Sequence, residues 1–221
     1  MSFNLNEYIK GDVFDYLSDI PDDYVDLVFT SCPDLSQTDF DKSKDGINSY
    51  QDFQKRAVEH FSRVIKPKGF VVICQTDRRV NGSVSSNHMW YAKCLEECGM
   101  VLKDYKIAVR NKVGKKDMYY FTFQHMLIYT YEGTIKRGGE WLRDIYVDKQ
   151  EKIGNQSVWS QDFCKFVIGH LTKENDVVID PFAGVGAVLL AARALNRQWW
   201  GAEISDEFFN KNLQLSETFW P

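Results

Sequence analysis

The sequence contains no apolar run long enough to cross a bilayer. Its longest runs, such as Phe70–Cys74, fall far short of the roughly 20 residues that a transmembrane helix needs. Residues Met1–Glu7 have neither the basic start and apolar stretch of a signal peptide nor the Arg-rich composition of a transit peptide. We therefore expect a protein without a membrane partner that remains where it is made, in the cytoplasm or at the nucleoid.

The sequence also lacks the residue spacings of a metal site. There is no Cys-x-x-Cys or His-x-x-x-His pair, so we expect no structural zinc and no other bound metal. The cysteines are odd in number and several lie in apolar or helical patterns, which indicates reduced thiols in a reducing compartment. The residues concerned are Cys32, Cys74, Cys94, Cys98 and Cys164, with His60, His88, His125 and His170.

An excess of basic charge is absent too, because the formal net charge is −4. This argues against a uniformly basic coat for nucleic acid, whose non-specific binding depends on neutralised phosphates. A nucleic acid must then meet a local patch, and polar stretches in the middle of the chain offer one. Solvated loops are the alternative interpretation of each stretch. The candidate substrate-binding residues are Arg79, Lys112, Lys115, Lys136 and Arg137.

What is present is enough for a single α/β domain over residues 1–221, because 44% of them are hydrophobic. Strand patterns alternate with helical ones, which predicts a mostly parallel, twisted sheet with helices on both faces and an antiparallel hairpin near one edge. The predicted strands are 25–30, 70–74, 101–109 with hairpin partner 119–131, 176–180 and 199–204, and the predicted helices are 50–66, 89–98 and 187–195.

Two turns follow predicted strands, at residues 31–34 and 181–186. Open parallel sheets bind ligands beyond the carboxyl ends of their strands, where both turns fall. In the later turn Gly184 and Gly186 allow a ligand to approach the backbone, and Glu203 ends the next strand as an acceptor for ribose hydroxyls. A Gly-x-Gly turn alone also suits tight strand–helix packing. The turn has no Gly-Lys-Ser/Thr ending, so a nucleoside without phosphates fits better than a nucleotide.

These residues resemble the amino-group DNA methyltransferases of the permuted beta class, in which the catalytic motif precedes the cofactor motif. The resemblance covers nearly the whole chain and implies one Rossmann-like domain. It rests on Gly11-Asp12, Ile20-Pro21, Val25-Asp26-Leu27, the 31–34 turn, Asp180-Pro-Phe-Ala-Gly-Val-Gly186 and Gly201-Ala-Glu-Ile204.

The resemblance implies S-adenosylmethionine as cofactor and DNA as partner, with RNA left open, and with a homodimer or a helper subunit as further options. Phe182 and the backbone of the two glycines are expected beside the methionine part, Glu203 on the ribose, and Asp12 and Ile204 around the adenine. The full set of cofactor-binding candidates is Asp12, Val13, Asp180, Pro181, Phe182, Gly184, Gly186, Glu203 and Ile204.

The catalytic candidates are Ser31, Cys32, Pro33 and Asp34, where the family has Asp, Asn or Ser, then Pro-Pro and an aromatic residue. Ser31 keeps the role of accepting a hydrogen bond from the target amine, and a serine here favours cytosine N4 over adenine N6. A carboxylate cannot stack on a flipped base. Either Asp34 accepts a hydrogen bond from an amine, or stacking falls to another aromatic residue, namely Phe40, Tyr50 or Trp90.

Two other functions remain open on sequence alone. Cys32 suggests carbon-5 methylation of cytosine by thiolate attack, although carbon-5 enzymes have the order Pro-Cys. The altered turn also suits an inactive partner subunit that binds only cofactor or nucleic acid. Target recognition is expected from residues 133–154, where Trp141, Arg143 and Tyr146 offer side chains for a groove or a splayed base.

Overall fold

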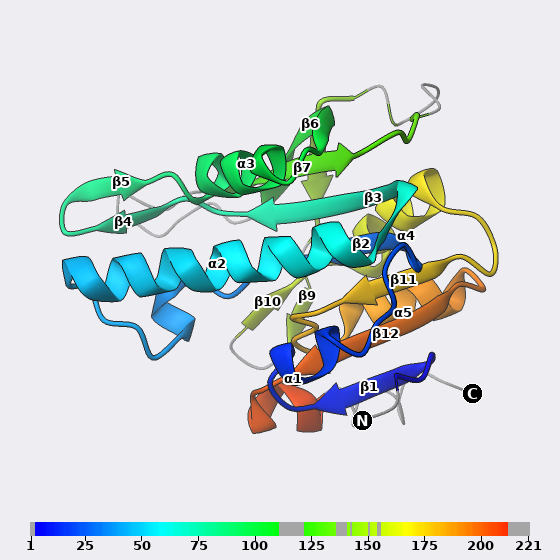
Figure 1. Cartoon of the computed structure of the whole chain (residues 1–221), viewed down its shortest axis with the longest axis horizontal. Coiled ribbons are helices and arrows are strands. Elements are labelled where there is room, and N and C mark those ends of the chain that lie inside the picture. Colours follow the sequence, from blue (N-terminus) through cyan, green and yellow to red (C-terminus); the bar gives the residue numbers. More distant parts are fainter. Residues whose placement is uncertain are drawn as a thin grey trace.

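The computed structural model describes residues 3–110, 122–135, 141, 143–149, 151–153 and 156–211. An eight-stranded sheet with the order β1-β12-β11-β2-β3-β7-β6-β8 forms its centre (Figure 1). The strands of this sheet are β1 (Glu7–Lys10), β2 (Val25–Thr30), β3 (Ile65–Gln75), β6 (Val101–Arg110), β7 (Phe123–Thr130), β8 (Ile145–Asp148), β11 (Val177–Asp180) and β12 (Gln198–Glu203). Two separate hairpins join β4 (Arg78–Val80) to β5 (Ser83–Ser85) and β9 (Glu151–Ile153) to β10 (Gln156–Val158).

Strand direction places the ends of many strands at one edge of the sheet. Five adjacent strands are parallel to one another, namely β1, β12, β11, β2 and β3. The next strand, β7, is antiparallel to both β3 and β6. The carboxyl ends of the parallel strands therefore share an edge with the start of β7. The predicted mostly parallel sheet is confirmed, and β6 with β7 is the predicted antiparallel pair. Beyond that pair, β8 adds a further strand parallel to β6.

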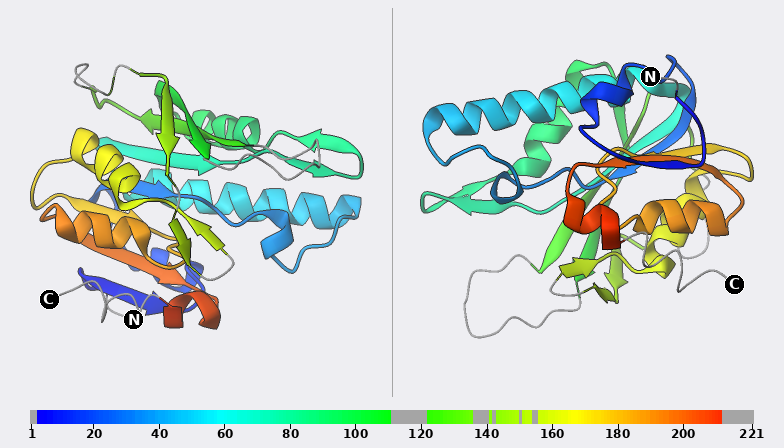
Figure 2. Two further views of the ribbon diagram at one scale, coloured as in Figure 1. Left: turned by 180° about the vertical axis from the view of Figure 1, so that it is seen from behind. Right: turned by 90° about the horizontal axis from the view of Figure 1, so that it is seen from below.

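Helices cover both faces of the sheet (Figure 2). They are α1 (Phe14–Leu17), α2 (Lys44–Val64), α3 (Asn87–Glu97), α4 (Gln161–Leu171) and α5 (Ala187–Ala194), and a 3-10 turn spans Leu35–Gln37. Alternate side chains of a strand point to opposite faces. Val28 and Val71 accordingly lie in the core under α1, α2 and α3, whereas Leu27 and Val72 lie in the core under α4 and α5.

One end of α2 and the β4–β5 hairpin project from the sheet on the same side (Figure 1). The Ser43 hydroxyl begins α2 by accepting a hydrogen bond from the Gly46 N–H at 3.0 Å, as an N-cap does. The hairpin turns at Asn81 and Gly82, whose φ angles of 50° and 82° are those of a tight two-residue hairpin turn. We call α2, the hairpin and the start of α3 the arm.

Several predicted boundaries differ from the structure. The helix predicted from residue 50 begins at Lys44, because Ser43 caps it there. Residues 67–69, which separate the predicted helix 50–66 from the predicted strand 70–74, belong to β3, and the Pro67 carbonyl accepts a hydrogen bond from the Glu132 N–H. Of the predicted partner strand, residues 119–121 lie outside the described part. Among the described helices, none is long and apolar enough to span a membrane.

Candidate active site

The loop after β11 is an open cradle of backbone at the carboxyl edge of the sheet. Gly184 and Gly186 have left-handed φ angles of 55° and 83°, a region that glycine adopts without strain. A Cβ added at Gly184 would meet nothing within 4 Å, so the space above this peptide is free. Phe182 is half-buried and packs its ring against Phe53 of α2 at 5.7 Å. A ligand can therefore lie directly on this loop.

Glu203 holds this loop through the backbone. Its carboxylate accepts hydrogen bonds from the Gly184 N–H at 2.9 Å and the Ser205 N–H at 2.7 Å. Partial burial raises the pKa of Glu203 above its ordinary value, and the two N–H donors oppose that effect. Each carboxylate oxygen still has lone pairs for a further donor, such as a ribose hydroxyl.

Asp12 lies beside Glu203 because β1 and β12 pair in register, Lys10 opposite Glu203. The Asp12 carboxylate accepts a hydrogen bond from the Phe14 N–H at 3.0 Å, while Val13 is buried. Ile204, the residue after Glu203, leaves 66% of its surface exposed. Carboxylates and an exposed apolar side chain thus line one end of the cradle.

A buried hydrogen bond joins the two loops of the site. The Thr30 hydroxyl, at the end of β2, donates to Asp180 Oδ1, at the end of β11, over 2.7 Å. The same oxygen accepts the Phe182 N–H at 3.2 Å. Burial raises the pKa of Asp180 to about 7, although these two donors lower it. The turn that follows Thr30 is therefore fixed next to the loop that follows Asp180.

The turn 31–34 presents Ser31 and buries Cys32. Within the described part of the chain, the Ser31 hydroxyl makes no hydrogen bond and is only partly covered. Cys32 is 2% exposed, and its burial raises the pKa of the thiol to about 12, with Asp180 adding to the effect and the neighbouring Tyr91 hydroxyl opposing it. A thiol of this kind stays protonated at neutral pH, which argues against carbon-5 chemistry at Cys32.

Asp34 is buried, and its carboxylate is bound by neighbouring side chains. Its carboxylate accepts hydrogen bonds from Gln75 Nε2 at 3.1 Å and from Arg78 Nε at 2.9 Å, and forms an ion pair with the Arg78 guanidinium. The Asp34 N–H donates to Gln37 Oε1 at 2.9 Å, which closes the 3-10 turn. Only 7% of Asp34 is exposed. The expectation that this carboxylate takes the target amine is therefore not favoured by its surroundings.

The three aromatic candidates for stacking lie in two environments. Phe40 and Tyr50 belong to an aromatic cluster with Phe53. The Tyr50 hydroxyl donates to the Pro33 carbonyl at 2.8 Å, which fixes the turn from below. Trp90 of α3 is partly exposed and points its Nε1 to the Gln51 carbonyl at 3.3 Å. Phe40 and Trp90 are both partly exposed, whereas Tyr50 is buried.

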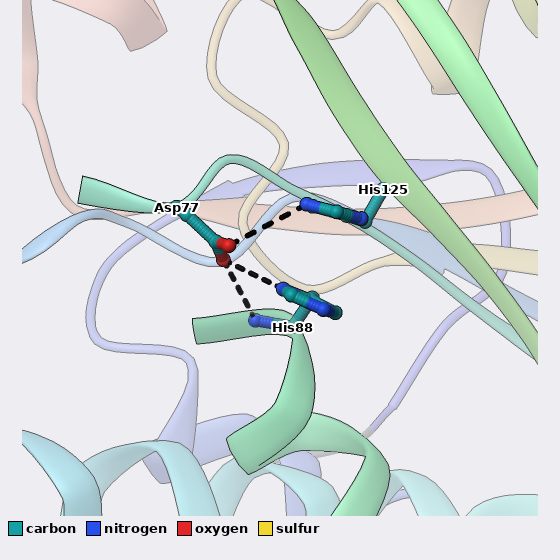
Figure 3. A group of neighbouring side chains, drawn as sticks. All are labelled: Asp77, His88 and His125. Carbon is teal, nitrogen blue, oxygen red and sulfur yellow. Dashed lines mark hydrogen bonds and ion pairs between the residues drawn. The ribbon is translucent and has the colours of Figure 1, made fainter. Parts of the chain in front are cut away.

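A cluster of ionisable residues at the same edge had no signal in the sequence. Asp77 follows β3, His88 begins α3 and His125 begins β7 (Figure 3). Asp77 Oδ1 lies 2.7 Å from His88 Nδ1, and Asp77 Oδ2 lies 3.5 Å from His125 Nε2. Burial, together with His88, lowers the pKa of His125. The cluster links β3, α3 and β7 near the turn 31–34.

The same three side chains offer one ligand atom each within 4.8 Å of one another. Two imidazoles and a carboxylate are a donor set that divalent transition metals accept. The imidazole rings are stacked, however, 3.6 Å apart and inclined by 11°. A nitrogen lone pair lies in its ring plane, so one ion cannot bind both rings unless one of them turns. As it stands, the cluster is a hydrogen-bonded one.

The candidates for nucleic-acid contact are only partly within the described residues. Arg79 is exposed on the β4–β5 hairpin. Lys112, Lys115, Lys136 and Arg137 lie outside the described residues. In the segment 133–154, the expectation for Trp141 is wrong, because it is 1% exposed and stacks on Phe166. Lys106 Nζ also donates to the carbonyls of Trp141 and Arg143 at 2.6 and 3.0 Å, which holds the backbone at these two residues against the core.

Comparison with protein families finds one match. The model of the N6/N4 DNA methylase family matches residues 136–214, which include the cradle and Glu203. The type II methyltransferase M.BglII of Bacillus subtilis is 27% identical over 96% of this chain and 69% of its own length. M.BamHI of Bacillus amyloliquefaciens is 23% identical over 92% of this chain. The chain spans 55% of the length of M.BamHI.

Solved structures share the fold at lower identity. The PvuII DNA methyltransferase, described as cytosine-N4-specific, superposes with a TM-score of 0.81 at 17% identity, covering 96% of this chain and 86% of its own. The SAM complex of M1.HpyAVI gives a TM-score of 0.68 at 20% identity, covering 94% and 97%. The chain therefore shares the overall fold of these methyltransferases.

Proposed function

We propose that this chain, which belongs to the amino-group DNA methyltransferases, transfers the methyl group of S-adenosylmethionine to the exocyclic amine of a DNA base, with cytosine N4 as the preferred target. One observation carries this proposal. The Thr30–Asp180 hydrogen bond of 2.7 Å fixes the turn with Ser31 beside the glycine cradle. A methyl donor on the cradle then faces an amine held by the turn.

The residues of the cradle suit S-adenosylmethionine. The space above Gly184 admits the methionine part against backbone rather than side chains. The Glu203 carboxylate is held in place by two backbone N–H groups and can accept hydrogen bonds from the ribose hydroxyls. Asp12 and Ile204 lie at the end that receives the adenine, one as a hydrogen-bond acceptor and one as an apolar surface. When bound, the cofactor supplies a methyl group on a positively charged sulfur.

The chain's own contribution to the reaction is orientation. The Ser31 hydroxyl and the Cys32 carbonyl accept hydrogen bonds from the two N–H groups of the target amine, which directs the nitrogen lone pair toward the cradle. As the nitrogen bonds to the methyl carbon, the sulfur–carbon bond of the donor would break and leave its electron pair on a neutral thioether sulfur. The nitrogen then loses one proton to water. Burial of Cys32 and the Tyr50–Pro33 hydrogen bond keep the turn in one conformation during this step.

Cytosine N4 is preferred over adenine N6 for two reasons. A serine at the first position of the turn is typical of the cytosine members that this sequence resembles. The PvuII enzyme, which is cytosine-N4-specific by name, also shares the fold at a TM-score of 0.81. Both arguments concern similarity, so the product of the reaction has to be measured.

A second candidate function follows from Asp34. The family has an aromatic residue at this position, and here its carboxylate is bound by Arg78 and Gln75 instead. A turn without its stacking residue suits a partner subunit that binds cofactor and DNA but transfers no methyl group. Cofactor binding without product distinguishes this candidate from an enzyme.

The test is mass spectrometry of nucleosides after DNA and RNA are incubated with the protein and S-adenosylmethionine carrying a deuterated methyl group. We expect label in N4-methylcytosine from DNA. Label only in N6-methyladenine would show that the target base is adenine and not cytosine. Label only in RNA would show that the substrate is RNA and not DNA. Absence of label, with cofactor binding measured by calorimetry, contradicts the proposed enzymatic activity and supports the non-catalytic partner subunit. The matched control is the Ser31→Ala variant, which should bind cofactor and incorporate far less label in the same time.

A further inference from the structure

A cavity of about 610 Å³ lies inside the arm, between α2, the β4–β5 hairpin and the start of α3. Figure 1 shows these elements projecting together beyond the sheet. Tyr50 and Gln54 of α2 form one wall, and Trp90 and Lys93 of α3 form another. The volume falls in the range of pockets that bind small organic groups.

The lining of this cavity suits an anionic ligand with a flat, polar ring. None of the described residues that line it is acidic, although the chain has 31 acidic residues. The two cations are Arg78, which is paired with Asp34, and Lys93, whose Nζ lies 3.7 Å from Glu97 and which is 61% exposed, so Lys93 is the cation that a ligand can reach. Amide and hydroxyl side chains from all three elements add donors and acceptors, namely Gln51, Gln54, Asn81, Asn87, Ser83, Ser85 and Ser86. A nucleotide presents a ring, hydrogen-bonding edges and a phosphate, which match these three kinds of group.

The cavity is also continuous with the catalytic turn, through three residues of its lining. The Tyr50 hydroxyl binds the Pro33 carbonyl, Leu35 directly follows the turn, and Arg78 pairs with Asp34. The described lining includes neither Ser31 nor any residue of the glycine cradle. A base in the cavity is therefore close to the site but out of reach of the methyl donor.

We propose that the arm cavity binds a nucleotide of the DNA strand adjacent to the nucleotide that is methylated. Its base stacks on the Trp90 ring, and its phosphate lies near Lys93, whose Nζ is 5.2 Å from the centroid of that ring. This inference rests on the proposed function for its choice of DNA as the ligand. It places recognition of flanking sequence on the arm instead of on residues 133–154.

The first test is photo-crosslinking, which requires no knowledge of the target sequence. The whole protein is irradiated with DNA duplexes of random sequence that carry 5-iododeoxyuridine, and the crosslinked peptides are sequenced. We expect a crosslink at Trp90. Crosslinks that map only to other peptides overturn the proposal.

The second test is DNA affinity measured by fluorescence anisotropy as a function of salt. Trp90→Leu should weaken binding roughly tenfold by removing one stacking interaction. Lys93→Gln, at a side chain that is 61% exposed, keeps the fold and should lower the salt dependence by about one released counterion. The matched control is Lys55→Gln, 48% exposed on α2 and outside the cavity, which should change neither.

The outcomes separate this inference from the proposed function. Methyl transfer to DNA with Lys93→Gln and Trp90→Leu indistinguishable from Lys55→Gln overturns the cavity and leaves the function. Loss of affinity in the two cavity variants without any methyl transfer supports the cavity and overturns the function. Absence of DNA binding by the wild-type protein overturns both.

Discussion

Thr30 and Asp180 are joined by a buried hydrogen bond of 2.7 Å, although 150 positions separate them in the chain. Each residue ends a strand, and each is followed by one of the two loops of the site. The bond therefore sets the distance between the turn 31–34 and the glycine cradle. Because the acceptor is a buried carboxylate, its protonation state matters for both loops.

Asp180 should make stability fall as pH rises. Burial raises its pKa from 3.8 to about 7, so the folded protein favours the protonated form. The resulting contribution is complete below the unfolded pKa of 3.8 and is lost as pH rises to about 7, on the order of 4 kcal/mol over the whole interval and ~3 kcal/mol above pH 5. Urea unfolding at pH 5 and pH 8 measures it. Asp180→Asn keeps the acceptor for Thr30 and should lose much less stability over this interval, and an equal loss in both proteins would contradict the assignment.

Ser31→Ala should reduce methyl transfer far more than cofactor binding. The substitution removes an acceptor for the target amine at the open side of the turn, and losses of roughly 10- to 1000-fold in kcat are usual for one positioned polar group. Single-turnover kinetics gives the rate, and calorimetry gives the cofactor Kd. Ser49→Ala, on the exposed side of α2, is the control. Equal losses in rate and in cofactor affinity would contradict the role of Ser31 in binding the target amine.

Glu203→Ala should have the opposite effect and weaken the cofactor. It removes the acceptor for the ribose and also the anchor of the Gly184 N–H, so we expect a Kd raised by about 10- to 100-fold. Asp206→Ala is the matched control, since its carboxylate is 87% exposed and pairs with Lys10. Calorimetry on both variants decides. An unchanged Kd for Glu203→Ala means that the adenosine does not lie where we place it.

Sequence patterns were sufficient for the parts of the fold with strong local signals. Val25–Thr30 is rich in apolar and β-branched residues and is a strand in the structure, and the cradle after Asp180 is marked by its glycines. The β4–β5 hairpin was missed, yet Asn81-Gly82 is a strong signal for a tight hairpin turn. An Asn-Gly pair of this kind predicts a short strand on each side of it.

The remaining features depend on contacts between distant residues. His88 and His125 each look isolated in the sequence, and only the antiparallel direction of β7 brings His125 to the edge where Asp77 lies. Trp141 lies in a polar stretch and was expected to face a nucleic acid, but the side chain of Lys106 fastens its backbone and buries its ring. No local pattern encodes either arrangement.

The Arg78–Asp34 pair should support the catalytic turn. Arg78→Gln leaves a carboxylate that is 90% covered without its cation, and removing one partner of such a pair costs about 1 to 3 kcal/mol when the other partner is partly open to solvent. Urea unfolding measures this cost. The double variant Arg78→Gln with Asp34→Asn removes the stranded charge and should recover part of the stability. Additive losses would show that the two side chains do not depend on each other.

Cys32→Ala separates amino methylation from carbon-5 methylation at the same turn. Attack on a ring carbon requires the thiolate, so this substitution would abolish a carbon-5 reaction completely. In the proposed amino reaction the Cys32 side chain only packs against its neighbours. The backbone carbonyl of residue 32 accepts a hydrogen bond from the target amine, and this carbonyl is still present in the alanine variant. We therefore expect a rate within about threefold of wild type at saturating cofactor, because no transition-state contact is removed. Labelled product analysis of the variant decides, and loss of all product with intact cofactor binding would assign the chemistry to the sulfur.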